Sequence, residues 1–68
     1  MTLPDYFTYL GWTTVDLARY AGINQATARK AYYGQTVTAR VARQIATAIS
    51  TALGRQVNVG DIIGLNFS

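Results

Sequence analysis

Residues 14–34 constrain the fold of this chain most, because they prescribe two short helices and a tight turn between them. A first helix is predicted over about residues 15–21, where Gly22 breaks it. Glycine suits a sharp turn because it adopts a positive φ without strain. Asn24 can then cap a second helix over about residues 25–33. Two short helices joined in this way are typical of a helix-turn-helix unit.

Helices are also predicted on both sides of this unit. Thr2 can cap a helix over about residues 4–10, and Thr38 can cap the longest helix, which extends to about Leu53. A last short helix is expected over about residues 59–63. No strand signal competes, so we predict one all-α domain of five helices that spans the 68 residues. We expect Trp12 in the core and semi-buried packing for Tyr6, Tyr9 and Tyr20.

The residue types that carry most enzyme and metal chemistry are missing or scattered. The chain has no cysteine and no histidine, and its three acidic residues are aspartates far apart in sequence. Lys30, the only lysine, falls on a predicted exposed face and not in a desolvated pocket that would activate it. We therefore expect no catalysis, no metal and no cofactor.

Neither a membrane segment nor a secretory signal is visible in the sequence. No apolar run approaches the ~20 residues that span a bilayer. The first residues lack a basic region followed by an apolar stretch. We therefore expect a cytoplasmic protein without a membrane partner.

The basic residues are unevenly distributed along a chain whose formal net charge is +3. Four of the six fall within fifteen residues that contain no acid: Arg29, Lys30, Arg40 and Arg43. A one-sided basic surface is expected of a protein that binds a polyanion. A solvated basic face on a small protein is the alternative, and charge alone does not decide between them.

The outer face of the helix at 25–33 carries side chains suited to reading DNA bases. At 100° per residue, this face is predicted to present Gln25, Ala26, Arg29, Lys30 and Tyr33. In the major groove, glutamine can pair with adenine, arginine or lysine can pair with guanine, and alanine can touch a thymine methyl. We therefore predict that these side chains contact bases, with Tyr33 able to reach a base or a phosphate.

Phosphate contacts are predicted around this helix, because helix amino ends offer free N–H groups and a favourable dipole. The candidates lie at or just behind the amino ends of two neighbouring helices: Thr14, Gln35, Thr36, Thr38, Arg40 and Arg43. For the two arginines, simple solubilisation of the longest helix is the alternative.

Several motifs occur in an order that resembles the lambda-repressor-like helix-turn-helix domains of the Cro and phage-repressor type. The resemblance covers about residues 3–63 and is carried by Leu10-Gly11-Trp12, Leu17-Ala18, Ala21-Gly22-Ile23 and Ala52-Leu53-Gly54. It implies a compact five-helix domain that binds double-stranded DNA, as a homodimer on a near-palindromic operator. The family's base-reading positions fall on the face described above, and its phosphate positions fall on Thr14 and residues 35–38.

A sequence-specific transcriptional regulator is therefore the first hypothesis, and the small size favours a Cro-like repressor of a phage or another mobile element. The second is an antitoxin or small protein-partner module with the same fold. An apolar patch near the C-terminal end can serve a homodimer or another partner, and we expect it to be exposed: Val59, Ile62, Ile63, Leu65 and Phe67. The third hypothesis is a purely structural helical module, in which replacing Arg29 and Lys30 changes only solubility.

Overall fold

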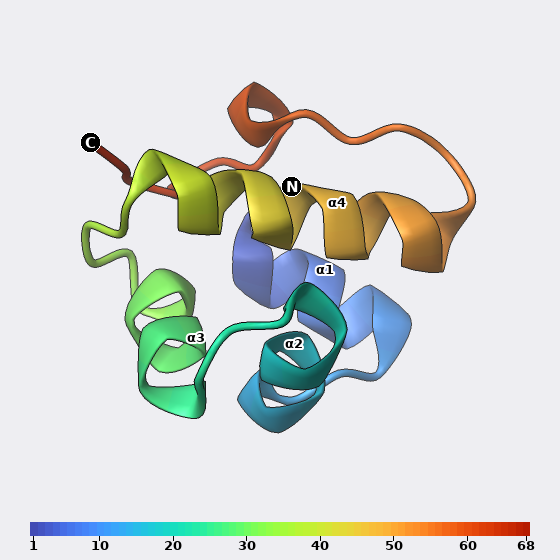
Figure 1. The fold of residues 1–68 in the computed structure, drawn as a ribbon. Coiled ribbons are helices and arrows are strands. Elements are labelled where there is room, and N and C mark those ends of the chain that lie inside the picture. Colours follow the sequence, from blue (N-terminus) through green and yellow to red (C-terminus); the bar gives the residue numbers. More distant parts are fainter.

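The computed structural model describes all of residues 1–68, which form four α-helices around one core (Figure 1). The helices are α1 (Leu3–Leu10), α2 (Thr14–Ala21), α3 (Gln25–Tyr32) and α4 (Ala39–Leu53). The predicted all-α class is confirmed, and each helix lies within one residue of its predicted bounds. None of these helices combines the length and the apolar character that crossing a bilayer demands.

The prediction of a fifth helix is wrong. Val59–Asp61 form only a single 3₁₀ turn, and Ile62 continues in an extended conformation with φ −95° and ψ 100°. Two glycines account for the short element. Gly60 weakens a helix through the backbone entropy that it loses, and Gly64 has a φ of 82°, which a helix cannot accommodate.

Side-chain caps determine where the four helices begin. The hydroxyl groups of Thr2 and Thr13 accept the N–H of an aspartate three residues later, and each aspartate accepts the threonine N–H at 2.9 Å. Asn24 and Thr38 cap α3 and α4 by accepting the N–H three residues onward, at 2.8 and 3.1 Å. The three caps predicted at Thr2, Asn24 and Thr38 are therefore confirmed, and each of the four satisfies a donor that the first helical turn leaves free.

The turn between α2 and α3 depends on Gly22, which has φ 71° and ψ 34°. The next residue, Ile23, donates its N–H to the carbonyl of Ala18 at 3.0 Å. This bond ends α2, and it forms only because the residue before Ile23 has a left-handed backbone conformation. The turn holds α3 against α2, and α2 in turn packs on α4 (Figure 1).

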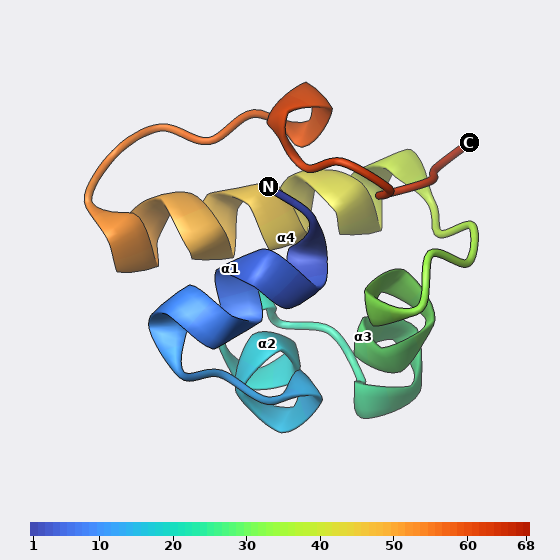
Figure 2. The same ribbon diagram turned by 180° about the vertical axis from the view of Figure 1, so that it is seen from behind.

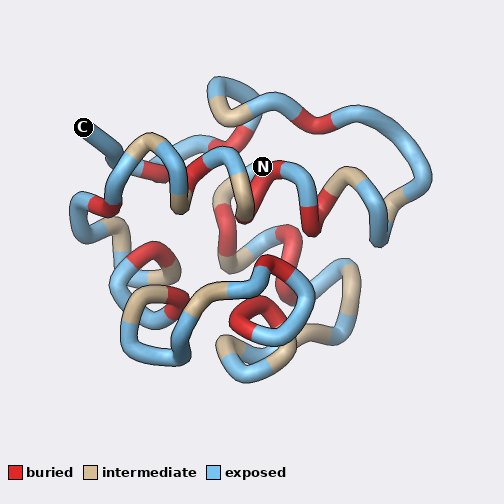
Figure 3. The backbone as a smooth tube through the Cα atoms, in the orientation of Figure 1, coloured by how far each residue is buried: buried red, intermediate tan, exposed pale blue.

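The core is built from a few large side chains and many alanines. Seventeen residues are buried, and the largest that are almost fully enclosed are Leu3, Leu17, Ile45 and Ile49. Seven of the seventeen are alanines, which let the helices approach closely. Figure 3 shows the buried stretches on the sides of the helices that face the middle of the molecule.

The segment after the 3₁₀ turn closes the molecule as it passes alongside α4 (Figure 2). Isolated parallel bridges join Thr2 to Ile63 and Val37 to Phe67. The Ile63 N–H donates to the carbonyl of the first residue at 3.0 Å, and the Val37 N–H donates to the carbonyl preceding Phe67 at 2.9 Å. The C-terminal segment is thus tied both to the start of the chain and to the loop before α4.

This pairing changes the predicted apolar patch. Ile62 is only 3% exposed and Leu65 only 7%, so the prediction that these two side chains are exposed is wrong. They join the core because the backbone around them bonds to its own chain and turns them inward. Val59 is half-buried against the core, whereas Ile63 and Phe67 remain exposed. The exposed part of the patch is therefore reduced to Ile63 and Phe67.

The tyrosines of the first two helices also depart from the expected semi-buried packing. Tyr6 is buried in the core, whereas Tyr9 and Tyr20 are exposed. Tyr20 nevertheless has a partner, because its ring stacks on Trp12. Trp12 itself is half-buried and packs at the edge of the core.

Candidate nucleic-acid interface

The outer face of α3 is exposed along its whole length. All the predicted base-reading side chains are exposed: Gln25, Ala26, Arg29, Lys30 and Tyr33. The opposite face is enclosed, with Ala28 and Ala31 both buried. The predicted exposure of the outer face is confirmed, and buried alanines form the inner face. Because its inner residues are small, α3 contributes little core volume and is supported by its neighbours.

The amino end of α3 presents unpaired hydrogen-bonding groups. The backbone N–H groups of Gln25 and Ala26 make no hydrogen bond within the protein, because the Asn24 side chain accepts only the N–H of Thr27. The Gln25 side chain lies beside the turn, in a hollow that Val15 and Ile23 also line. An amide in this position can offer both a donor and an acceptor to a ligand.

The carboxyl end of α3 is fixed by backbone hydrogen bonds and by aromatic packing. Gly34 has a φ of 78°, and the N–H of Gln35 reaches back to the carbonyl of Lys30 at 2.9 Å. Tyr33 is 70% exposed, yet its ring packs edge-on against Tyr32 with the ring centroids 5.1 Å apart. The exposed phenol is therefore held at a defined position at the end of the helix.

Two hollows flank α3, one on each side. The first lies between α3 and the end of α1 with the amino end of α2, and its lining includes Thr14, Arg29 and Tyr33. The second lies between α3 and the loop before α4, and its lining includes Lys30, Thr36 and Thr38. The structure thus brings three predicted phosphate-contacting residues beside the predicted base-reading face: Thr14, Thr36 and Thr38. No aspartate or glutamate side chain lines either hollow.

The amino end of α2 offers the better donor pair for an anion. The N–H groups of Thr14 and Val15 make no hydrogen bond within the protein. At α4, by contrast, the N–H of Ala39 donates to the Ser68 carbonyl at 3.1 Å, which leaves the N–H of Arg40 as the free donor. No local sequence pattern predicts this contribution of the C-terminal segment, because Ala39 and Ser68 lie far apart in the chain.

Three other predicted phosphate residues lie outside both hollows. Gln35 is exposed in the loop that follows α3. Arg40 and Arg43 line a different depression, between α2 and α4, together with Trp12 and Tyr20. Both arginines lie on an exposed side of α4, as the sequence predicts. The sequence does not indicate that Trp12 and Tyr20 line the same depression.

Asn66 is a further residue that the sequence analysis did not identify. Its side-chain amide donates to the Gly34 carbonyl at 2.7 Å, immediately before the loop that carries Thr36 and Thr38. The C-terminal segment therefore holds the loop in place beside α3. A single polar residue between Leu65 and Phe67 is the only signal in the sequence, and it does not specify a partner.

The side chains around α3 supply hydrogen-bonding groups and positive charge. No three carboxylate, imidazole or thiol groups lie together as a metal site would require. The residues around α3 supply amide, guanidinium, ammonium, hydroxyl and backbone N–H groups, which bind anions and base edges. No protein-family model matches this chain, and neither the curated proteins nor the solved structures include a match.

Proposed function

We propose that this protein is a sequence-specific DNA-binding transcriptional regulator that inserts α3 into the major groove of double-stranded DNA. One observation carries the proposal: the outer row of α3 is exposed from end to end, with no acidic side chain on it. An α-helix fits the major groove, where Gln25 pairs with adenine, and Arg29 or Lys30 pairs with guanine. Ala26 lies against a thymine methyl, and Tyr33 reaches the edge of the site.

The groups on both sides of α3 then hold the DNA backbone. Thr14 and the free N–H groups of α2 bind a phosphate on one side, and Thr36 and Thr38 bind one on the other. Gln35 and Arg40 reach phosphates farther along the duplex. Contacts of this kind set the orientation of the protein but carry no sequence information.

We further propose that two copies bind one near-palindromic operator. The exposed Ile63 and Phe67 supply the contact between them, in a smaller patch than the sequence suggested. Such a protein acts as a Cro-like repressor in the cytoplasm of a bacterial or phage-infected cell, with occupancy set by its own concentration. Sedimentation with and without operator DNA tests the stoichiometry, and Ile63→Asp should weaken any dimer.

Selection of bound duplexes from a random pool tests the DNA proposal directly. A recurrent motif with an inverted repeat is expected, and the selected duplex should outcompete random DNA by roughly 10³-fold or more. Affinity should fall steeply with salt, because each neutralised phosphate contributes about −0.9 to the slope of log K against log salt. A pool without enrichment, or a flat salt response, contradicts the proposal.

A matched pair of double variants separates recognition from net charge. Arg29→Ala with Lys30→Ala removes two positive charges from α3, and Arg19→Ala with Arg55→Ala removes two from elsewhere on the surface. The first pair should abolish preference for the selected duplex, whereas the second should lower affinity slightly for all duplexes. Equal losses in the two variants would mean that α3 contributes charge alone.

A further inference from the structure

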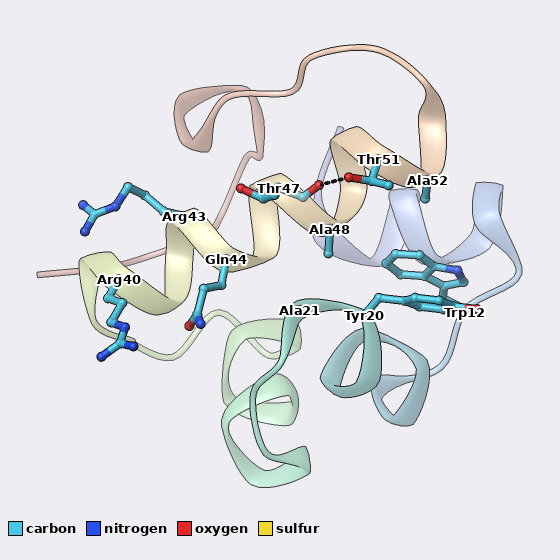
Figure 4. A pocket seen from close by; sticks show the side chains of 10 residues that line it. All are labelled: Trp12, Tyr20, Ala21, Arg40, Arg43, Gln44, Thr47, Ala48, Thr51 and Ala52. Carbon is cyan, nitrogen blue, oxygen red and sulfur yellow. Dashed lines mark hydrogen bonds between the residues drawn. The ribbon is translucent and has the colours of Figure 1, made fainter.

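A groove of about 520 Å³ separates α2 from α4 (Figure 4). Small side chains keep it open: Ala21 comes from the end of α2, and Ala48 and Ala52 come from successive turns of α4. Thr47 and Thr51 border it farther along α4. Of the residues that line this groove, only Arg40 takes part in the DNA-binding proposal, because the groove lies between α2 and α4 and not beside the outer face of α3.

The two ends of the groove differ in chemistry. Trp12 and Tyr20 form one end, where their rings stack with centroids 5.0 Å apart and planes inclined by 17°. Arg40 and Gln44 lie at the other end, as Figure 4 shows. From Arg40 to Thr51 the groove follows eleven residues of α4, which corresponds to about 16 Å. An aromatic surface and a basic surface are thus separated by the length of three helical turns.

The basic end lacks any acidic counterpart within the protein. α4 contains no aspartate or glutamate, and no acidic side chain lines the groove. The chain's three aspartates each accept the backbone N–H at the start of a helical element: Asp5, Asp16 and Asp61. Arg40 and Arg43 are therefore complementary to a carboxylate that a second copy of this chain is poorly placed to supply.

We propose that the groove binds a short acidic segment of another protein. An aromatic or aliphatic side chain of that segment packs against Trp12 between α2 and α4, and an aspartate or glutamate pairs with Arg40 or Arg43. The length of the groove decides the class of ligand, because a compact metabolite cannot contact both ends, whereas a peptide can. Burial of the aromatic end on binding supplies most of the binding energy, and the arginines supply orientation and specificity.

The only tryptophan of the chain lies in the groove, so its fluorescence reports occupancy without a label. The probe is a displayed library of random peptides roughly 12 residues long, the length of a helix that runs along the groove. Selection on the intact protein, without DNA, should enrich peptides that combine an apolar residue with a carboxylate. The enriched peptide should shift the Trp12 emission, and its Glu→Gln counterpart should bind about tenfold more weakly or worse.

Three variants locate the binding. Ala52→Phe fills the groove from an exposed position, and Arg40→Gln with Arg43→Gln removes both charges of the groove, so each should lower peptide affinity about tenfold. Arg19→Gln with Arg55→Gln makes the same charge change outside the groove and should leave peptide affinity unchanged. Thermal unfolding followed by circular dichroism shows that each variant is folded, and Arg40→Gln with Arg43→Gln decides the outcome if Ala52→Phe is not.

Other results would overturn the proposal. Enriched peptides without a carboxylate, or an unchanged Trp12 emission, would contradict the binding of an acidic segment in the groove. If Ala52→Phe converts a dimer into a monomer, the groove belongs to self-association. If it abolishes DNA binding, the groove belongs to the DNA interface. Because the peptide experiment contains no DNA, its failure leaves the DNA proposal untouched, and the reverse also holds.

Discussion

Gln25 is the residue to which the proposal assigns the reading of one base pair of the operator. Its amide is exposed, has no partner within the protein, and lies at the amino end of α3 beside two free backbone N–H groups. A side chain placed there can reach a base edge in the major groove with little rearrangement, since the Asn24 cap already fixes the first turn. Thr36 lies in the hollow beside Lys30, and the proposed binding mode assigns it a phosphate contact.

Gln25→Ala should therefore relax the preference for one base pair of the operator. The expected loss is about 1–3 kcal/mol for the preferred base and close to none for its replacements. Binding is measured against a series of duplexes that differ by single base pairs. Thr36→Ala serves as the control and should weaken binding to every duplex alike. Identical profiles for the two variants would show that their assigned roles are wrong.

A pair of glycines isolates the backbone requirement of the turn. Gly22 has a φ of 71° and Gly60 has no positive φ, and a Cβ added at either position would meet no atom within 4 Å. Gly22→Ala should destabilise the fold by about 1–2 kcal/mol through the left-handed conformation alone. Gly60→Ala should be neutral or stabilise it by up to roughly 1 kcal/mol. Urea unfolding measures both, and equal values would exclude backbone strain at Gly22.

At the scale of elements, the start of α1 provides a pH-dependent contribution to stability. The N–H of Thr2 donates to the Asp5 carboxylate, and this bond, followed by the Thr2 hydroxyl, lowers the pKa of Asp5 below its ordinary value of 3.8. A lowered pKa in the folded state means that the stabilisation is complete above the unfolded pKa. It is lost as the pH falls through the folded pKa.

Asp5→Asn should thus flatten the acid side of the stability profile. Thermal unfolding midpoints measured from pH 7 down to pH 2 should fall less steeply for the variant below about pH 4 than for the wild-type protein. At neutral pH the wild-type protein should be the more stable of the two. Parallel curves across the whole range would show that the carboxylate does not contribute through its charge.

The C-terminal segment offers a test with two adjacent isoleucines. Ile62 is 3% exposed and Ile63 is 63% exposed, although they are neighbours in sequence. Ile62→Ala should lower the free energy of unfolding by about 2–5 kcal/mol, because it leaves a cavity in the core. Ile63→Ala should change it by less than about 0.5 kcal/mol. Urea unfolding of dilute protein distinguishes them, and a larger effect at Ile63 would contradict the observed register of the segment.

The sequence predicts an element well where the residues that determine it lie within a few positions of one another. The starts of α1 to α4 were predictable because a cap and its partner lie three residues apart, as in Thr13 and Asp16. The exposed face of α3 was predictable because helical periodicity is also local. The 3₁₀ turn was missed because the Asn58–Asp61 spacing imitates a helix start, while Gly60 and Gly64 end it within one turn.

At the scale of the whole molecule, the sequence does not indicate which distant residues come into contact. Nothing near Ile62 or Leu65 in the sequence indicates whether they are buried, because their environment comes from α4 and from the beginning of the chain. The groove was invisible for the same reason, since Trp12, Tyr20 and Arg40 belong to three separate segments. The proposed peptide site could therefore be recognised only after the helices were placed.

The bridges that join Thr2 to Ile63 and Val37 to Phe67 can form only after all four α-helices have been synthesised. A ribosome that has translated residues 1–61 has supplied every α-helix, but not the stretch that fastens the first residues to the loop before α4. Until that stretch emerges, the nascent chain exposes the apolar surface that Ile62 and Leu65 will cover. Chaperones that recognise such surface should meet this protein during that interval and lose contact with it once Ile62 and Leu65 have packed.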